Sequence, residues 1–150
     1  MVLDWGCFYG YRVYRGNSLS TRACNTLCVK AIAMTIKLDN YRALSWNTLY
    51  AGKHWATRSR LVEEAHMLVG YVIMAMKPKL FSRPVDITIT AVQKGRIIDS
   101  DNICAKILID ALKGKIIVDD TPTYVRRVTT ESKKGKEDMV IMEITETKGV

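Results

Sequence analysis

The amino-acid sequence predicts an α+β fold, with a small mixed β-sheet, two principal helices and a C-terminal β-hairpin. Residues 85–90 alternate between apolar and polar side chains, which is typical of a strand with one buried face. Apolar residues recur at helical spacing through residues 58–76. Near the C-terminus, the strand-like runs 125–130 and 139–145 are joined by a polar segment containing Gly135, which predicts the hairpin.

The chain has the length of a single domain and carries a strong positive charge. Its 150 residues are 48% hydrophobic, enough for a core, and its formal net charge is +8. Such a charge suits a polyanionic partner, either nucleic acid or an anionic membrane surface. No apolar run reaches the roughly 18 residues of a membrane span, so we expect no membrane-embedded segment. The four cysteines form no secreted framework or paired zinc motif, which favours reduced thiols in the cytoplasm.

The N-terminal residues 1–33 are the least informative part of the sequence. They lack the apolar core and the small-residue cleavage site of a signal peptide. We expect them to form a poorly packed extension, such as an upstream start codon would add, in front of a domain spanning residues 34–150. Within that domain, alternation at residues 35–38 predicts the first strand.

An aromatic and cationic segment precedes the long helix. Its members gather around Gly52 and are Tyr50, Lys53, His54, Trp55, Arg58 and Arg60. Cations neutralise phosphates and aromatic faces stack on exposed bases, so this mixture predicts a DNA-binding segment. The alternative is a solvated loop anchored by a buried Trp55.

The long helix is predicted to run from Arg58 to Met76, with Pro78 ending it. Its second half is apolar on nearly all sides, and a helix of that kind is enclosed rather than half exposed. In a small domain this pattern favours a subunit interface. We expect His66 to have a structural or solvent-facing role rather than to bind a metal.

The segment from Asp99 to Asp120 concentrates the candidate catalytic chemistry. If a strand at residues 95–98 continues through Asp99 and Asp101, both carboxylates face the same side and converge. Converging carboxylates repel unless a hard cation lies between them, and Mg²⁺ prefers such oxygen ligands. A β-α-β segment would return Asp119 or Asp120 beside them as a third ligand. The alternative is that the same residues are ordinary helix caps and turns.

A short helix is expected between the two acidic pairs. Lys106, Asp110 and Lys113 share its polar face, being three or four residues apart, while its apolar residues face inward. Lys106 and Asp110 can therefore form an ion pair. Gly114 is expected to end this helix, and residues 116–118 to form a short buried strand.

Two lysines, Lys133 and Lys134, lie at the tip of the predicted hairpin. Their charge makes them candidates for a contact with DNA phosphates. A charged tip equally suits simple exposure to water.

The spacing of the acidic segment resembles that of the RusA-type Holliday junction resolvases. Their signature is Asp-x-Asp-Asn, a lysine, Asp-x-Leu and a following Asp-Asp, matched here by Asp99, Asp101, Asn102, Lys106, Asp110, Ala111, Leu112, Asp119 and Asp120. The segment 44–60 also looks like that of phage-type members, so the resemblance covers residues 35–144. Two departures stand out. Lys106 lies five residues after Asp101 instead of four, and the loop after the helix is about one residue short, which leaves Asp119 and Asp120 as alternatives.

The resemblance implies a RusA-like, homodimeric and Mg²⁺-dependent endonuclease that resolves Holliday junctions or related branched DNA, with Mn²⁺ as a substitute metal. It implies that Asp99, Asp101, Asp120 and Lys106 are catalytic and that Asp119 is a further candidate ligand. Lys106 would touch the scissile phosphate or steady the charge on the leaving oxygen. The expected setting is a prokaryotic or phage-infected cell. The alternatives are a nuclease for flaps or forks, and a non-catalytic basic DNA-binding module.

Overall fold

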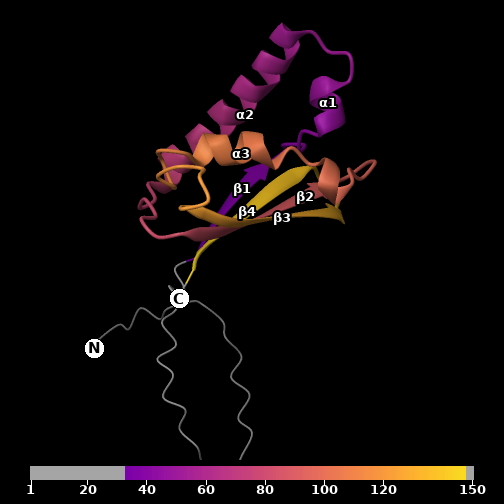
Figure 1. Ribbon diagram of the computed structural model, residues 1–150. Coiled ribbons are helices and arrows are strands. Elements are labelled where there is room, and N and C mark those ends of the chain that lie inside the picture. Colours follow the sequence, from indigo (N-terminus) through magenta and orange to yellow (C-terminus); the bar gives the residue numbers. More distant parts are fainter. Residues whose placement is uncertain (1–32, 148–150) are drawn as a thin grey trace, which may run out of the picture.

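A computed structural model describes residues 33–147, and Figure 1 shows the arrangement of their helices and strands. The predicted extension lies outside the described residues except for Ala33, which begins the first strand. The elements in chain order are β1 (Ala33–Asp39), α1 (Trp46–Tyr50), α2 (Trp55–Met76), β2 (Val85–Gln93), the 3₁₀ helix η1 (Ser100–Asn102), α3 (Ala105–Leu112), β3 (Val125–Lys134) and β4 (Met139–Glu146). The predicted mixed α+β class is confirmed.

The four strands form one mixed sheet in the order β1-β4-β2-β3. β4 is antiparallel to both β1 and β2, whereas β3 runs parallel to β2. The most apolar strands take the centre, and Val140, Met142 and Ile144 of β4 are fully buried. β3 forms one edge and carries charged residues such as Arg126 and Lys133, which discourage pairing with a further strand.

The predicted C-terminal β-hairpin is wrong, because β2 lies between β3 and β4 and pairs with both. The connection at residues 135–138 crosses the end of β2, where the Gly135 N–H donates to the Gln93 carbonyl at 2.9 Å. The Asp138 carboxylate then accepts from the Lys94 N–H, also at 2.9 Å. Buried backbone groups need partners, so the largely buried β2 requires a neighbour on each side. That requirement overrides pairing between strands that are adjacent in sequence.

β2, α3 and β3 form a β-α-β unit, because α3 connects two parallel neighbouring strands. The strands of this unit are not those predicted from sequence. Residues 94–99 bend away after β2, and the predicted strand at 95–98 is absent. The predicted strand at 116–118 is also absent, since Ile116 and Ile117 are buried in a turn in which Ile117 forms only isolated bridges. Each acidic pair therefore lies in a connection, one before α3 and one after it.

α2 and α3 lie on the same side of the sheet, with α3 closer to the strands (Figure 1). α2 begins at Trp55, three residues before its predicted start, because a ring nitrogen of His54 accepts a backbone N–H of the first turn. It ends at Met76 as predicted, since Lys77 takes a left-handed conformation with φ of 45° before Pro78. The core between the helices and the sheet is aliphatic, and its fully buried members include Ile36, Leu38, Val69, Ile87, Ile89, Leu112, Met142 and Ile144.

One face of α2 is left uncovered by the other residues of the range 33–147. Met67, Tyr71 and Met74 lie along it at helical spacing and are 55%, 68% and 72% exposed. A cavity of about 330 Å³ beside them is also lined by His66 and Lys115. The sequence predicts that this half of the helix is enclosed, whereas in the described part of the chain these three side chains are exposed. None of the helices in residues 33–147 combines the length and apolar character needed to cross a membrane.

We expect Gly135→Ala to destabilise the domain. An alanine Cβ at this position would overlap Val92 Cγ1 where the 135–138 connection crosses β2. Overpacking of this kind typically costs about 1–3 kcal/mol. Urea unfolding followed by circular dichroism measures the loss. Gly95→Ala is the matched control, because its Cβ would meet only Arg42 Nη1 at 3.7 Å, and equal stability of the two variants would contradict the crossing geometry.

Candidate functional site

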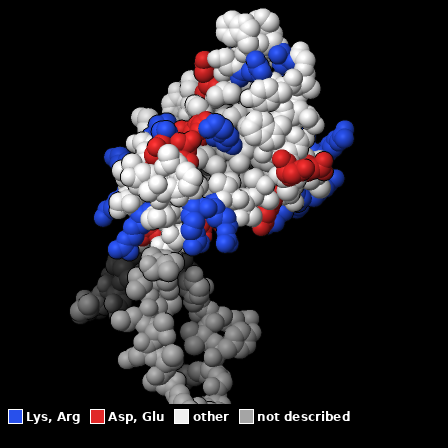
Figure 2. All heavy atoms as spheres, in the orientation of Figure 1, with Lys and Arg blue, Asp and Glu red and all other residues white. Residues whose placement is uncertain are grey.

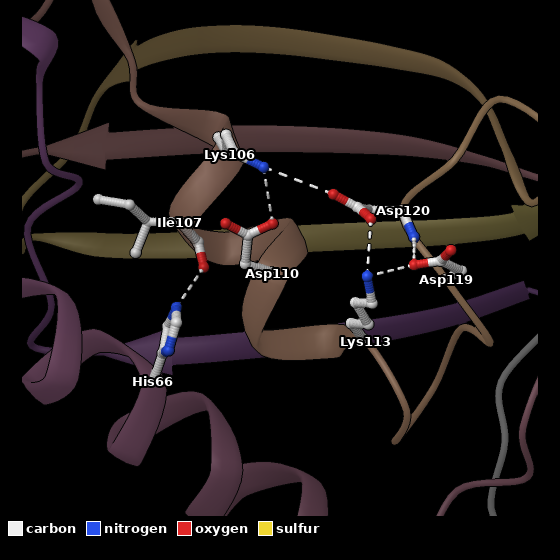
Figure 3. Close-up of polar contacts among 7 residues, drawn as sticks. All are labelled: His66, Lys106, Ile107, Asp110, Lys113, Asp119 and Asp120. Carbon is white, nitrogen blue, oxygen red and sulfur yellow. Dashed lines mark hydrogen bonds and ion pairs between the residues drawn. The ribbon is translucent and has the colours of Figure 1, made fainter.

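Five charged side chains from α3 and the following turn form one ion-pair cluster, shown in Figure 3. We call it the α3 cluster, and it consists of Lys106, Asp110, Lys113, Asp119 and Asp120. Lys106 Nζ donates to Asp110 Oδ1 at 3.0 Å and to Asp120 Oδ2 at 3.4 Å. Lys113 Nζ donates to Asp120 Oδ1 at 3.1 Å and also contacts Asp119. The polar helix face predicted from sequence is confirmed, and the returning turn brings Asp120 to it.

Lys113 favours the ionised form of Asp120 within the α3 cluster. Lys113 and a hydrogen bond involving Asp119 lower the pKa of Asp120 from 3.8 to about 2. In return, Asp110 raises the pKa of Lys106, and Asp119 raises that of Lys113. Two ammonium groups and three carboxylates leave the α3 cluster with a net charge of −1 at neutral pH. A cavity of about 340 Å³ opens beside it, lined by Lys106, Asp120 and the exposed Val128 of β3.

The segment that leads to Asp99 and Asp101 is hydrogen-bonded to side chains of β2 and β3. The Gln93 side-chain carbonyl accepts from the Ile98 N–H at 2.7 Å, and Ser132 Oγ donates to the Ile98 carbonyl. Both backbone polar groups of Ile98 are therefore hydrogen-bonded to side chains of residues near the ends of β2 and β3. Gln93 is fully buried, and its Nε2 has no hydrogen-bond partner among the described residues. This anchoring fixes where the acidic turn begins.

Asp99 and Asp101 lie on a tight turn and not on a strand. The Asp99 carbonyl accepts from the Asn102 N–H at 2.9 Å, which closes the single turn of η1. The expectation that strand alternation aligns the two carboxylates is therefore wrong. The Asn102 side chain in turn accepts from the Asn47 N–H at 3.4 Å, joining this turn to α1.

The two acidic segments occupy different ends of the β-α-β unit. The first follows the end of β2 and the second precedes the start of β3, and the strands are parallel, so these points lie at opposite ends of the strand pair. Figure 2 shows charged side chains gathered over α3 and again near η1, with uncharged surface between them. Within residues 33–147, no three His, Cys, Asp or Glu side chains lie close enough together to hold a metal ion.

The predicted DNA-binding residues around Gly52 spread over the end of the α1–α2 pair. Residues 53 and 54 connect the helices, whereas Trp55, Arg58 and Arg60 belong to the first turns of α2. Trp55 is 67% exposed, which rules out the alternative of a buried anchor. Arg60 Nε lies 3.5 Å from Glu64 Oε1 within the same helix.

Sequence reasoning missed α1 and its aromatic side chain Trp46. The Trp46 and Tyr50 rings stack with their centroids 5.7 Å apart, and Arg58 Cζ lies 5.1 Å from the Tyr50 ring centroid. The available signal was the four-residue spacing of the aromatics directly after Ser45, whose hydroxyl accepts from the Thr48 N–H at 3.0 Å and caps the helix. The sequence places Lys113 correctly on the polar face of α3, but it does not indicate that Lys113 pairs with Asp119 and Asp120.

Two further predictions concern single residues. Lys133 and Lys134 end the edge strand β3 instead of lying at a hairpin tip, and Lys133 Nζ is 2.8 Å from Glu131 Oε2. His66 Nε2 hydrogen-bonds to the Ile107 carbonyl at 3.1 Å and ties α2 to α3, as Figure 3 shows. The structural role expected for His66 is confirmed.

Comparisons with known proteins add no family assignment. The chain matches no model of a protein family, and no curated protein matches it. The functional proposal therefore rests on the chemistry of the described residues and on the resemblance of the acidic signature.

We expect Asp120 to titrate near pH 2, as carboxyl-detected NMR would measure. Its folded-state pKa lies below the ordinary 3.8, so the contribution of the α3 cluster to stability is present above pH 3.8 and is lost as the pH falls toward 2. Lys113→Ala should raise the midpoint toward 3.8, because the largest cause of the shift is removed. Lys115→Ala is the control, and an unchanged midpoint in Lys113→Ala would contradict the assigned cause.

Proposed function

We propose that this chain is a metal-dependent endodeoxyribonuclease that cuts Holliday junctions or related branched DNA as a homodimer. The observation that carries the proposal is the position of Asp120, which the turn after α3 brings within 3.4 Å of Lys106. The signature lysine and the last signature carboxylate thus share one exposed cavity. The net charge of +8 and the cationic, aromatic end of α2 supply a surface suited to DNA.

The donor chemistry suits Mg²⁺, with Mn²⁺ as a substitute. Mg²⁺ is usually held by one or two carboxylates, with water and substrate phosphate completing its shell, so a pair of aspartates is sufficient. Asp119 with Asp120, and Asp99 with Asp101, are the two candidate pairs. When bound, the ion would activate water and neutralise charge at the reacting phosphate. Lys113 lowers the pKa of Asp120 from 3.8, and even at the ordinary pKa this carboxylate is ionised at neutral pH, so it is available as a ligand whenever Lys113 releases it.

The cationic side chains have separate tasks in this proposal. Lys106 contacts the scissile phosphate, since its side chain is largely exposed and its ammonium group lies beside Asp120, the candidate metal ligand. Lys53, His54, Trp55, Arg58 and Arg60 bind the DNA backbone at the start of α2. Lys133 and Lys134 at the end of β3 provide a second contact.

A non-catalytic DNA-binding module is the second candidate, and a specific observation favours it. The second acidic pair already has local partners: the Asp119 carboxylate accepts from the Asp120 N–H at 2.9 Å, and Asp120 accepts from Lys113 at 3.1 Å. A nuclease that acts on flaps or forks is a third hypothesis for the same residues. Incubation with a synthetic four-way junction, a flap and a fork in Mg²⁺ separates all three, because the module cuts none of them and the cleavage pattern distinguishes the nucleases.

We expect Asp101→Asn to retain junction binding and to lose cleavage in Mg²⁺. The amide preserves the shape of the side chain and removes the negative charge that attracts a cation. Glu143→Gln is the matched control, because Glu143 is an exposed carboxylate of β4 between the buried Met142 and Ile144, which places it on the opposite face of the sheet. Gel-shift and cleavage assays on the same junction measure both effects, and undiminished nicking by Asp101→Asn would reject its metal role.

The exposed apolar face of α2 supports the proposed homodimer. Met67, Tyr71 and Met74 form a contiguous apolar stripe, and such stripes often mark interaction surfaces. A two-fold pairing of one patch with its copy would also present two equivalent sites to the two halves of a junction.

We expect the double variant Tyr71→Glu with Met74→Glu to be monomeric, because each new carboxylate would be buried against its copy. Sedimentation velocity measures the change, and junction cleavage should shift from paired cuts to single nicks. Leu80→Glu, at a 50% exposed apolar residue beyond the end of α2, is the control. A double variant that sediments like the wild type would remove α2 from the interface.

A further inference from the structure

The groove between α1, α2 and α3 has an apolar floor. Its volume is about 460 Å³, within the range of small-ligand sites. Leu49, Cys104 and Ile107 line it and are 2%, 3% and 7% exposed. Burial raises the pKa of the Cys104 thiol, so this side chain is neutral and behaves as part of the apolar surface.

Aromatic rings form the mouth of this groove. Trp46 and Tyr50 are 39% and 60% exposed, and their rings stack with centroids 5.7 Å apart. Arg58 lies over the Tyr50 ring, and no ion pair within residues 33–147 occupies its guanidinium. An exposed ring with a cation beside it matches a flat aromatic ligand that carries negative charge.

The polar rim of the groove leads to the α3 cluster. Lys106 and Asp110 line both this groove and the cavity next to Asp120. Asp110 is paired with the cation Lys106, whereas Glu63 accepts from the neutral Ser59 Oγ at 3.1 Å and keeps its negative charge. Within residues 33–147, Arg58 is the cation of the lining that no carboxylate pairs, and it lies at the aromatic end of the groove, over the Tyr50 ring.

We propose that this groove binds an unstacked nucleobase of a DNA strand, with the base against Tyr50 and Trp46 and its phosphate near Arg58. A base has two flat faces to stack and an adjoining phosphate to pair, whereas an aliphatic side chain of a protein partner would use neither the rings nor the cation. The groove therefore selects DNA with unpaired bases over continuous duplex. This inference rests on the proposed action on branched DNA and names the structural feature that the protein recognises.

The test measures binding of the full chain without divalent metal, so that cleavage does not interfere. The probes are a single-stranded oligonucleotide, a duplex with a two-nucleotide bulge and a fully paired duplex of the same length, each carrying one 2-aminopurine. The wild type should prefer the single strand and the bulge, and 2-aminopurine fluorescence should change when its base stacks on the rings. Equal affinity of the wild type for all three probes would overturn the proposal.

Tyr50→Ala should weaken binding to the single strand and the bulge by about 5- to 150-fold, since stacking on one aromatic ring is worth roughly 1–3 kcal/mol per base. Tyr50→Phe is the matched control, because it keeps the ring and should bind like the wild type. Arg58→Gln should weaken binding and reduce its salt dependence. Unchanged affinity in Tyr50→Ala, or an equal loss on the fully paired duplex, would refute the base site.

The outcome is separable from that of the nuclease proposal. If the groove binds a base but the protein is not a nuclease, Tyr50→Ala loses affinity for the single strand and the wild type cuts nothing. If the protein is a nuclease but the groove binds no base, Tyr50→Ala binds and cuts branched DNA like the wild type. If a partner protein or a second copy occupies the groove instead, Tyr50→Ala changes the sedimentation of the protein and leaves DNA affinity unchanged, which also overturns the base site.

Discussion

The parallel pairing of β2 and β3 is the constraint on which the rest of the candidate site depends. Two adjacent parallel strands need a crossover connection, and α3 is that crossover. Everything between Gln93 and Val125 is placed by this requirement, including both acidic segments and Lys106. Because the strands run in the same direction, the two connections leave from opposite ends of the pair. The long side chain of Lys106 then extends from α3 to Asp120 in the second acidic segment.

Local charge balance explains how a basic protein can carry an acidic candidate site. The α3 cluster compensates three carboxylates with two ammonium groups, so the positive charge of the chain remains for other surfaces. Those surfaces include the end of the α1–α2 pair, where Arg58 lies over an aromatic ring. The α3 cluster is exposed and screened by solvent, so its ion pairs add little to stability, and their main effect is to hold Lys106 and Asp120 side by side.

Local patterns in the sequence predicted individual elements well and strand partners poorly. The alternation of Val85, Ile87 and Ile89 identified β2, and helical spacing identified α2 to its last residue. The prediction of a C-terminal hairpin was wrong because β3 and β4, although close in sequence, are separated in the sheet by β2, which needs a partner on each side. The prediction that Asp99 and Asp101 continue a strand was wrong for a related reason. The Ile98 N–H donates to the Gln93 side chain instead of to a neighbouring strand, and the chain bends there.

The sequence by itself determined the α+β class, the charge of the protein, the spacing of the acidic signature and the shared face of Lys106, Asp110 and Lys113. These properties follow from composition and from the fixed periods of helix and strand, which operate over a few residues. Only the tertiary structure decided that Asp120 meets Lys106, that Asp99 and Asp101 lie apart from the α3 cluster, and that Trp46 and Tyr50 open a groove beside it. Those relations depend on which strands pair and in which direction, and pairing is settled by burying β2 in the centre of the sheet.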